Sequence, residues 1–242
     1  MDGYSHPSKG NRDVISIADA FAVTEVLQQA NAASLVALAA RVQIKQKRKG
    51  EQLFRDKETV STIYIVVSGL VALFKINSQG EKKVIFVLGQ GKMVNEIILQ
   101  DLPASVNCEI FEDAQILCFN KQDLLDVMEH DFALTKAVID SLSLKTRRMY
   151  RQLKNTSNSV RGDKRLAAKL WKLSGDYGAV CKSGICIDID LSITYLADML
   201  GSQRETVSRQ LKTLTEQGIV VIEQGRFVIV NRDELARIFK SP

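Results

Sequence analysis

Residues 192–211, which read SITYLADMLGSQRETVSRQL, constrain the fold more than any other stretch of the chain. Ser192 is of a residue type that caps helix N-termini. Ala197 is small enough for two helices to cross closely, and Gly201 follows four residues later, where a turn needs a positive φ. Val207 comes ten residues after Ala197 and can pack back on the first helix. These offsets predict two short helices joined by a tight turn, a helix-turn-helix.

The second helix of this pair carries a cluster of polar side chains. An αα-hairpin with a purely structural role fits the same offsets, but it gains little from such a cluster. A helix that reads DNA needs it, because Arg bonds guanine O6 and N7 and Glu accepts from cytosine N4. Arg204, Glu205, Ser208 and Arg209 are the candidate base-reading residues, Gln203 and Thr206 flank them, and Arg226 is expected to contact phosphate from the tip of the following hairpin.

Ahead of this motif, residues 44–120 alternate short apolar runs with turn residues. The runs are rich in Val, Ile and Phe, and the breaks contain Gly, Ser and Asn. This spacing predicts a small antiparallel barrel or jelly roll. Strands are expected at 62–67, 71–76, 83–88 and 116–119, with Gly80 in a left-handed turn. Residues 18–41 contain no Pro or Gly and are predicted to be helical.

A long helix is predicted at 121–155, which also lacks Pro and Gly. Its second half carries a stripe at steps of three and four: Thr135, Val138, Leu142, Thr146, Met149 and Leu153. Such a stripe packs either on its own domain or on the same helix of a second chain. A long helix that follows a barrel favours the second arrangement. We therefore expect a homodimer with its seam at 132–155.

A polar segment at 155–162, rich in Ser, Asn and Thr, is the expected linker. Beyond it the pattern predicts a helix at 163–173, a loop at 175–184, strands at 185–189, 218–222 and 226–230, and a last helix beginning near Asp233. The expected fold class is α+β. The expected divisions are an effector domain at 14–130, a dimerisation helix at 131–156 and a DNA-binding domain at 160–242.

The segment SQRETVSRQLKTLTEQGIV, followed by a glycine-tipped hairpin, resembles the cyclic-AMP receptor protein/FNR (Crp/Fnr) family of bacterial transcription regulators. The resemblance covers almost the whole chain from about Val14. It implies an N-terminal cyclic-nucleotide-binding-type β-roll (jelly roll), a long dimerisation helix and a C-terminal winged helix-turn-helix. It also implies a homodimer that binds a palindromic operator in double-stranded DNA, with RNA polymerase as a partner if the chain is an activator.

The family's base-reading positions fall on Arg204, Glu205, Ser208 and Arg209 of this chain. The two arginines and Glu205 resemble the cyclic-AMP receptor branch, which reads TGTGA-like half-sites. Ser208 resembles the FNR branch. The resemblance therefore implies a GTGA-like half-site.

In family members that bind cyclic AMP, a Gly-Glu segment holds the ribose and an Arg-Ser pair neutralises the phosphate. The corresponding residues here are Asn95, Glu96, Ala104 and Ser105. Glu96 is retained, but Ala104 has no charge to pair with a phosphate. Nearby Lys92 is a point charge and does not reproduce a bidentate Arg. The resemblance therefore implies an effector pocket for an unidentified small molecule other than cyclic AMP.

Cysteine and histidine usage limits the cofactors. An iron–sulfur cluster of the FNR type needs several cysteines near the N-terminus, and the first cysteine here is Cys108. With 2 His in the chain, a His-rich metal site is excluded, and we expect no cluster, haem or metal. Cys108 and Cys118 fit small core residues. Cys181 and Cys186 flank a turn and are either a redox pair or two unrelated thiols.

The distribution of charge agrees with a nucleic-acid partner. The net charge is +5, and Lys and Arg dominate residues 145–172, where Asp163 is the only acid. No run approaches the roughly 18 apolar residues of a membrane span, so we expect a cytoplasmic protein without a membrane partner. No nucleophile–base arrangement or phosphate-binding loop indicates an enzyme. A regulatory module that acts on protein partners through its C-terminal helices is the alternative to a DNA-binding regulator.

Overall fold

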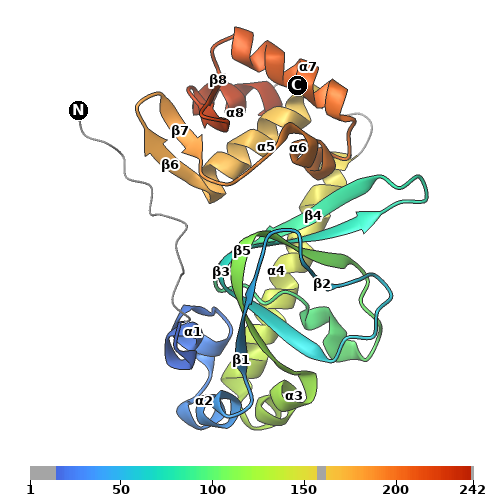
Figure 1. Ribbon diagram of the computed structural model, residues 1–242, viewed down its shortest axis with the longest axis vertical. Coiled ribbons are helices and arrows are strands. Elements are labelled where there is room, and N and C mark those ends of the chain that lie inside the picture. The colour runs from blue at the N-terminus through green and yellow to red at the C-terminus, as the bar shows by residue number, and fades with distance from the viewer. Residues whose placement is uncertain (1–14, 157–161, 241–242) are drawn as a thin grey trace.

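The structure of the chain, a computed structural model, describes residues 15–156 and 162–240. Figure 1 shows an N-terminal part below and a C-terminal part above, with one long helix rising between them. Most of the predicted linker at 155–162 lies outside the described residues.

The first helical region is broken into short elements. The single helix predicted at 18–41 is wrong: the structure has α1 (Ile17–Val23), the 3-10 helix η1 (Leu27–Gln29) and α2 (Ala32–Ala39). Ser16 caps α1 by accepting from the Asp19 amide at 3.1 Å, and Asn31 caps α2 by accepting from the Ser34 amide at 2.9 Å. The second N-cap starts a new helix, which explains the break.

Five antiparallel strands form the β-roll of the N-terminal part. They are β1 (Gln43–Lys47), β2 (Gln52–Phe54), β3 (Thr62–Ile76), β4 (Lys82–Leu88) and β5 (Asn107–Asn120), in the order β1-β5-β3-β4 with β2 also on β5. The strands predicted at 62–67 and 71–76 are one continuous strand, β3. Its register against β5 shifts around Gly69, where φ is +79° and a Cβ would lie 2.2 Å from the Asp113 carbonyl oxygen. Only glycine fits this close crossing.

The turn between β3 and β4 forms as predicted. The Asn77 side-chain oxygen accepts from the amides of Gln79 and Glu81, each at 2.9 Å, and Gly80 has a φ of +80°. This local hydrogen bonding is typical of an Asx turn. It ends the hairpin that projects from the roll in Figure 1. A 3-10 helix, η2 (Glu96–Gln100), follows β4.

The long helix predicted at 121–155 is divided at Asp131. α3 (Lys121–His130) ends there, and α4 (Phe132–Thr156) begins. The Asp131 carboxylate accepts from the Asn31 amide at 2.8 Å and from the Leu134 amide at 3.1 Å. Asp131 therefore caps α4 and ties it to the N-terminal helices.

One face of α4 packs on its own β-roll. Leu134 and Val138 are buried there, and the Gln152 side chain donates to the Ile85 carbonyl at 2.8 Å. The stripe predicted as a dimer seam is therefore wrong at Val138, which is 1% exposed within a single chain.

Elsewhere on its surface, α4 exposes large apolar side chains. Phe132, Ile139, Met149 and Tyr150 are 81%, 52%, 49% and 67% exposed. Thr146, a member of the predicted stripe, is exposed with them, and Leu153 lies outside the described side chains. This exposed apolar face, Phe132, Ile139, Met149 and Tyr150, is hereafter the α4 outer face.

The C-terminal part is a small sheet surrounded by helices. Its elements are α5 (Gly162–Asp176), β6 (Gly178–Cys181), β7 (Gly184–Ile187), α6 (Ile193–Leu200), α7 (Arg204–Glu216), β8 (Val220–Glu223), β9 (Arg226–Ile229) and α8 (Arg232–Lys240), with strand order β6-β7-β9-β8. The loop predicted at 175–184 is wrong at 178–181, where β6 forms and pairs with β7. α8 packs on α5, where the rings of Trp171 and Phe239 lie 5.7 Å apart.

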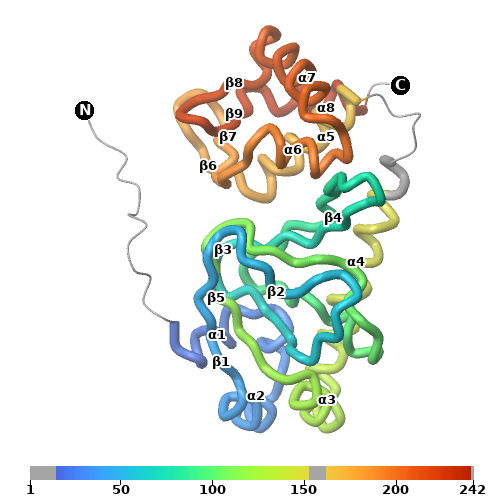
Figure 2. Tube along the Cα trace, turned by 45° about the vertical axis from the view of Figure 1, so that its right-hand side comes forward, coloured from blue at the N-terminus to red at the C-terminus, as the bar shows by residue number. Residues whose placement is uncertain are grey.

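The two parts share one hydrophobic cluster, in which Phe74 and Phe111 of the roll are buried with Leu196 of α6. α6 lies across β4 in both Figure 1 and Figure 2. Lys82 of β4 pairs with Glu109 and lies 4.9 Å from the ring centre of Tyr195. The Tyr195 hydroxyl donates to the same carboxylate at 3.1 Å. The C-terminal part is therefore docked on the roll through α6.

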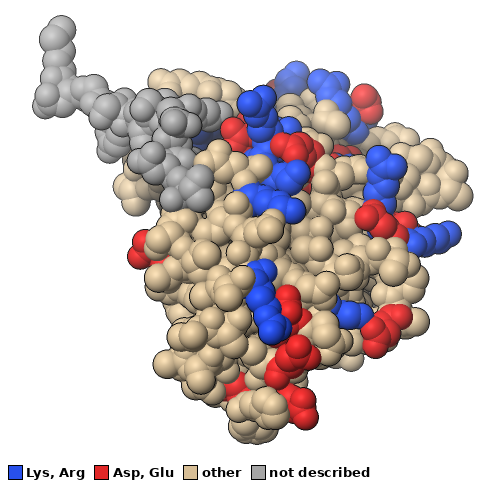
Figure 3. Space-filling model, turned by 60° about the horizontal axis from the view of Figure 1, so that its bottom comes forward, with Lys and Arg blue, Asp and Glu red and all other residues tan. Residues whose placement is uncertain are grey.

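Figure 3 shows the molecule with its N-terminal part, the bottom of Figure 1, turned toward the viewer. On the face shown, basic and acidic side chains lie in small mixed groups, and most of the surface carries neither. This mixture is unlike the single-sign surface of a nucleic-acid site. Among the helices of residues 15–156 and 162–240, none is both long enough and apolar enough to cross a bilayer.

Candidate nucleic-acid interface

α6 and α7 form the helix-turn-helix that the sequence predicts. Ser192 caps α6 by accepting from the Tyr195 amide at 3.0 Å, and Gly201 ends it with a φ of +57°. Ala197 is 3% exposed and Val207 is fully buried in the same core. The structural roles predicted for these residues are confirmed.

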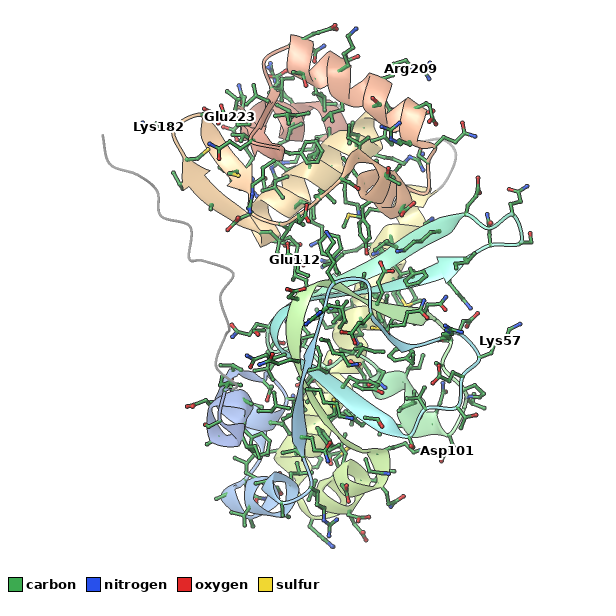
Figure 4. The ribbon with its side chains drawn as sticks, in the orientation of Figure 1. Lys57, Asp101, Glu112, Lys182, Arg209 and Glu223 are labelled. Carbon is green, nitrogen blue, oxygen red and sulfur yellow. The ribbon has the colours of Figure 1, made fainter. Side chains whose placement is uncertain are left out.

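α7 has one buried and one exposed face. Val207, Leu211 and Leu214 pack into the core of the C-terminal part. Arg204, Glu205 and Arg209 are exposed, and Figure 4 shows Arg209 pointing away from the body of the protein. The helix therefore holds its charged side chains out on a rigid, well-packed scaffold, the arrangement that a major-groove helix requires.

The other predicted contact residues frame this exposed face. Gln203 precedes α7 and is exposed, while Thr206 and Ser208 are half-buried. The side chain of Gln203, itself within the described range, makes no capping hydrogen bond to α7. The first amides of α7 therefore stay open to an anion, and helix N-termini favour anions.

The hairpin β8–β9 differs from the prediction in the position of Arg226. The tip is Gln224 and Gly225, which have φ values of +50° and +78°. Arg226 begins β9 opposite Glu223, and its guanidinium pairs with Asp188. Placing Arg226 at the tip was therefore wrong, and a phosphate contact from it requires the Asp188 pair to open.

The basic run around the linker is not one continuous surface. Lys172 pairs with Asp176 at 2.5 Å, while Lys169 is half-buried on α5. Burial lowers the pKa of Lys169 to about 8, helped by the charges of Lys172 and Lys83 and opposed by Asp176. An anion that binds near Lys169 would stabilise its charged form.

Two side chains of α4 bind the carboxylate of Glu96. Its carboxylate is 1% exposed, accepts from the Ser141 hydroxyl at 2.6 Å and pairs with the Lys145 ammonium. Lys145 also donates to the carbonyls of Met93 and Val94, at 2.9 Å and 3.0 Å. Burial lowers the pKa of Lys145, and the charge of Glu96 opposes that shift. All three ammonium donors of Lys145 therefore have acceptors in a nearly dry junction.

The other predicted effector residues make different contacts. The Asn95 side chain accepts from the Tyr64 amide at 3.0 Å and donates to the Thr62 carbonyl at 2.8 Å. Ala104 is buried inside the roll, and Ser105 is exposed. Asn95 and Ala104 therefore serve the packing of the roll. The sequence reasoning missed Lys145 as the partner of Glu96. The only signal was that Lys145 begins the basic run at 145–172, which contains a single acid within itself.

The cysteines are all free thiols, and two of them are buried in the roll. Burial raises the pKa of Cys118 to about 11 and raises that of Cys108 further, so neither is a reactive thiolate. Cys186 pairs across the strands with Ala179, so Cys181 is its diagonal neighbour. Diagonal strand neighbours are about 7–8 Å apart, beyond the usual disulfide span of about 4.4–6.8 Å. Their proposed redox pairing therefore needs backbone movement.

The residues of 15–156 and 162–240 contain no cluster of three or more His, Cys, Asp or Glu side chains that fits a metal ion. Among the acids described above, Glu96, Asp176 and Asp188 are paired with lysine or arginine instead. What the C-terminal part offers chemically is a polar helix face, an open helix N-terminus and nearby ammonium groups. Groups of these kinds can bind a polyanion that also presents base edges.

Two family models match the chain. A model for the Crp-like helix-turn-helix domain covers residues 164–238, and one for the cyclic nucleotide-binding domain covers residues 44–131. The first contains α6 and α7 with the whole polar face, and the second contains the β-roll. Their order confirms the predicted fold class, with a β-roll before a helix-turn-helix.

Whole-chain comparisons agree with the two models. The chain is 29% identical over 199 residues to the anaerobic regulatory protein of Bacillus subtilis (strain 168), covering 79% of this chain and 83% of that protein. It is 26% identical over 178 residues to the cyclic AMP receptor protein of Thermus thermophilus, covering 73% and 79%.

A solved structure shares the fold. A CRP/FNR-family transcriptional regulator of Thermus thermophilus superposes with a TM-score of 0.68 at 20% identity, covering 82% of this chain and 99% of that one. The two matched models cover residues 44–131 and 164–238, and the relatives matched over most of the chain include regulatory proteins. The chain therefore belongs to the Crp/Fnr family of transcription regulators, with an effector-type β-roll joined to a Crp-like helix-turn-helix.

Proposed function

We propose that this chain binds palindromic operator DNA as a homodimer, with α7 in the major groove and GTGA-like half-sites. The observation that carries the proposal is that α7 exposes Arg204, Glu205 and Arg209 while Val207 and Leu211 anchor it in the core. Arg bonded to guanine O6 and N7 supplies specificity. Glu205 accepts from cytosine N4 or orients Arg209, one helical turn away.

The α4 outer face supports a homodimer. These are exposed apolar side chains spread along a 25-residue helix, each about half exposed or more, and a second copy of the helix can cover them. A twofold dimer presents its recognition helices to successive major grooves, about 34 Å apart. In this proposal residues 14–130 form the effector domain, 131–156 the dimerisation helix and 160–242 the DNA-binding domain.

Selection from a pool of random duplexes with the full-length protein tests this function. The expected product is a palindrome whose half-sites contain GTGA and are centred about one helical turn apart. Recovery of no enriched motif would leave the alternative, a module that acts on protein partners. A regulator of this kind works in the cytoplasm, where the chromosome lies, and contacts RNA polymerase if it activates.

Cyclic AMP is not the effector in this proposal. A nucleotide ribose in contact with Glu96 must displace Lys145, and Ala104 offers the phosphate no cation. A charged hydrogen bond contributes about 1.5–3 kcal/mol, so its loss lowers affinity roughly tenfold to a hundredfold. The effector-type domain is proposed to sense another small molecule.

Calorimetry and operator binding check this expectation. We expect cyclic AMP at 100 μM, roughly the scale of a weak metabolite complex, to give no heat of binding and no change in operator affinity. A micromolar dissociation constant, or a gain in operator affinity on adding cyclic AMP, would contradict it.

A further inference from the structure

Lys83 of β4 reaches the helix-turn-helix from the effector-type part of the chain. A methyl group built on Gly201 would lie 3.3 Å from Cδ of Lys83 and 3.5 Å from its Nζ. Gly201 is the turn between α6 and α7, two residues before Gln203. The Lys83 ammonium therefore lies close to the N-terminus of the exposed helix α7.

Lys83 differs from its neighbour Lys82 in having a free charge. Lys82 is neutralised by Glu109 and lies 4.3 Å from the ring centre of Phe74. Lys83 is exposed, and within the described part of the chain its ammonium has neither an ion pair nor a hydrogen bond. Lys82 therefore serves the docking of α6, while Lys83 remains available to an anion.

A second cation lies near Lys83. Lys169 of α5 is close enough for the Lys83 charge to help lower its pKa, after burial and Lys172. Asp176, which opposes that shift, is paired with Lys172. Two ammonium groups from different parts of the chain thus repel each other beside the turn, and an anion bound there relieves the repulsion.

We propose that Lys83 is a DNA contact supplied by the effector domain, and that its ammonium binds a backbone phosphate beside the N-terminus of α7. The inference rests on the proposed function and adds to it a contact from outside the helix-turn-helix. Lysine suits a phosphate because it acts as a compact point charge with rotatable donors. The first amides of α7, which Gln203 does not cap, also favour an anion.

This contact is expected to add affinity without sequence preference, because phosphate contacts position a protein and carry no base information directly. It also makes DNA affinity depend on the docking of α6 on β4. A change in the roll that moves β4 away from α6 would remove the Lys83 contact while leaving α7 intact. Effector domain and DNA would then be coupled directly through one side chain.

Fluorescence anisotropy with the full-length protein, measured over a range of salt concentrations, tests the inference. Lys83→Gln removes the charge, and Lys83→Arg keeps it. Lys45→Gln is the matched control, because Lys45 is also an exposed lysine on a strand of the roll, and β1 lies away from α6 in Figure 1. The DNA is a GTGA palindrome and, separately, a scrambled duplex of equal length.

Lys83→Gln is expected to lower the slope of log affinity against log salt by about 0.9 for each protomer. Affinity at about 0.15 M salt should fall roughly fivefold per protomer, equally on both duplexes, as a slope of about 0.9 predicts. Lys83→Arg should retain the wild-type slope, and Lys45→Gln should match the wild type.

A slope for Lys83→Gln equal to that of Lys45→Gln overturns the inference and leaves the proposed function standing. A loss confined to the palindrome also overturns it, because a phosphate contact acts on every sequence. If the wild-type protein binds neither duplex, the proposed function fails and the inference fails with it. DNA binding by the wild type therefore distinguishes a failure of the Lys83 inference from a failure of the proposed function.

Discussion

Lys145→Met is expected to lower the free energy of unfolding by about 3–5 kcal/mol, the usual cost of removing one partner from a buried ion pair. The Glu96 carboxylate is 1% exposed, so without Lys145 its charge stays in a nearly dry junction with Ser141 as its remaining side-chain partner. The carbonyls of Met93 and Val94 lose their donor as well. Urea unfolding followed by circular dichroism measures the change.

Two further variants make this prediction specific. Lys145→Met combined with Glu96→Gln removes both charges and should recover most of the lost stability, because no buried charge is left unpaired. Lys136→Met is the matched control on the same helix: Lys136 is 61% exposed and pairs with Asp140, and an exposed pair of this kind contributes about 0.3–0.5 kcal/mol. A loss for Lys145→Met no larger than that of the control would contradict the account of the junction.

Ile139→Glu combined with Met149→Glu is expected to convert the dimer to monomers. Both side chains belong to the α4 outer face and are 52% and 49% exposed within one chain, so the monomer fold should tolerate the change. At a seam between two helices, each Glu would be buried without a partner. Sedimentation velocity measures the oligomeric state.

Operator affinity should fall with the dimer, by at least about a hundredfold toward the non-specific range, because a monomer engages one half-site. Leu144→Glu is the control: Leu144 lies on the same helix but lines a groove with Lys92 and Lys145, away from the α4 outer face. It should remain dimeric. An unchanged dimer for the double variant would show that the seam lies elsewhere.

The helix-turn-helix was predictable from sequence because its determinants are local. The small Ala197, the turn at Gly201 and the inward Val207 stand within ten residues of one another, and each has a steric requirement. The Asn77 turn was predictable for the same reason, since its hydrogen bonds run to residues two and four positions along. Local backbone geometry can be predicted from residue type alone.

Features that depend on tertiary contacts were not predictable. The break between α3 and α4 is held by Asp131 accepting from the amide of Asn31, 100 residues away. Val138 fits a dimer stripe by spacing, and only the packing of α4 on the roll shows that it is internal. Apolar spacing predicts a buried face, but it does not say which surface covers that face.

The charged residues show the same limit. Lys145 and Lys169 belong to one basic run in the sequence, yet Lys145 is bound by Glu96 and Lys169 lies half-buried near Lys83. Arg226 was expected at a hairpin tip and pairs instead with Asp188. Charge along a sequence predicts a polyanionic partner in general, while the residues that remain free to meet it depend on which acids the fold brings close.

One measurement tests the central claim, that α7 reads DNA, most directly: binding-site selection from random duplexes with the wild type and with Arg204→Ala in parallel. The wild type should yield a GTGA-containing palindrome. Arg204→Ala should lose roughly 1–3 kcal/mol on that site and relax the preference at one base position in each half-site, while keeping the spacing. If both proteins return the same motif with the same sharpness, Arg204 does not read a base, and the recognition face proposed for α7 is wrong.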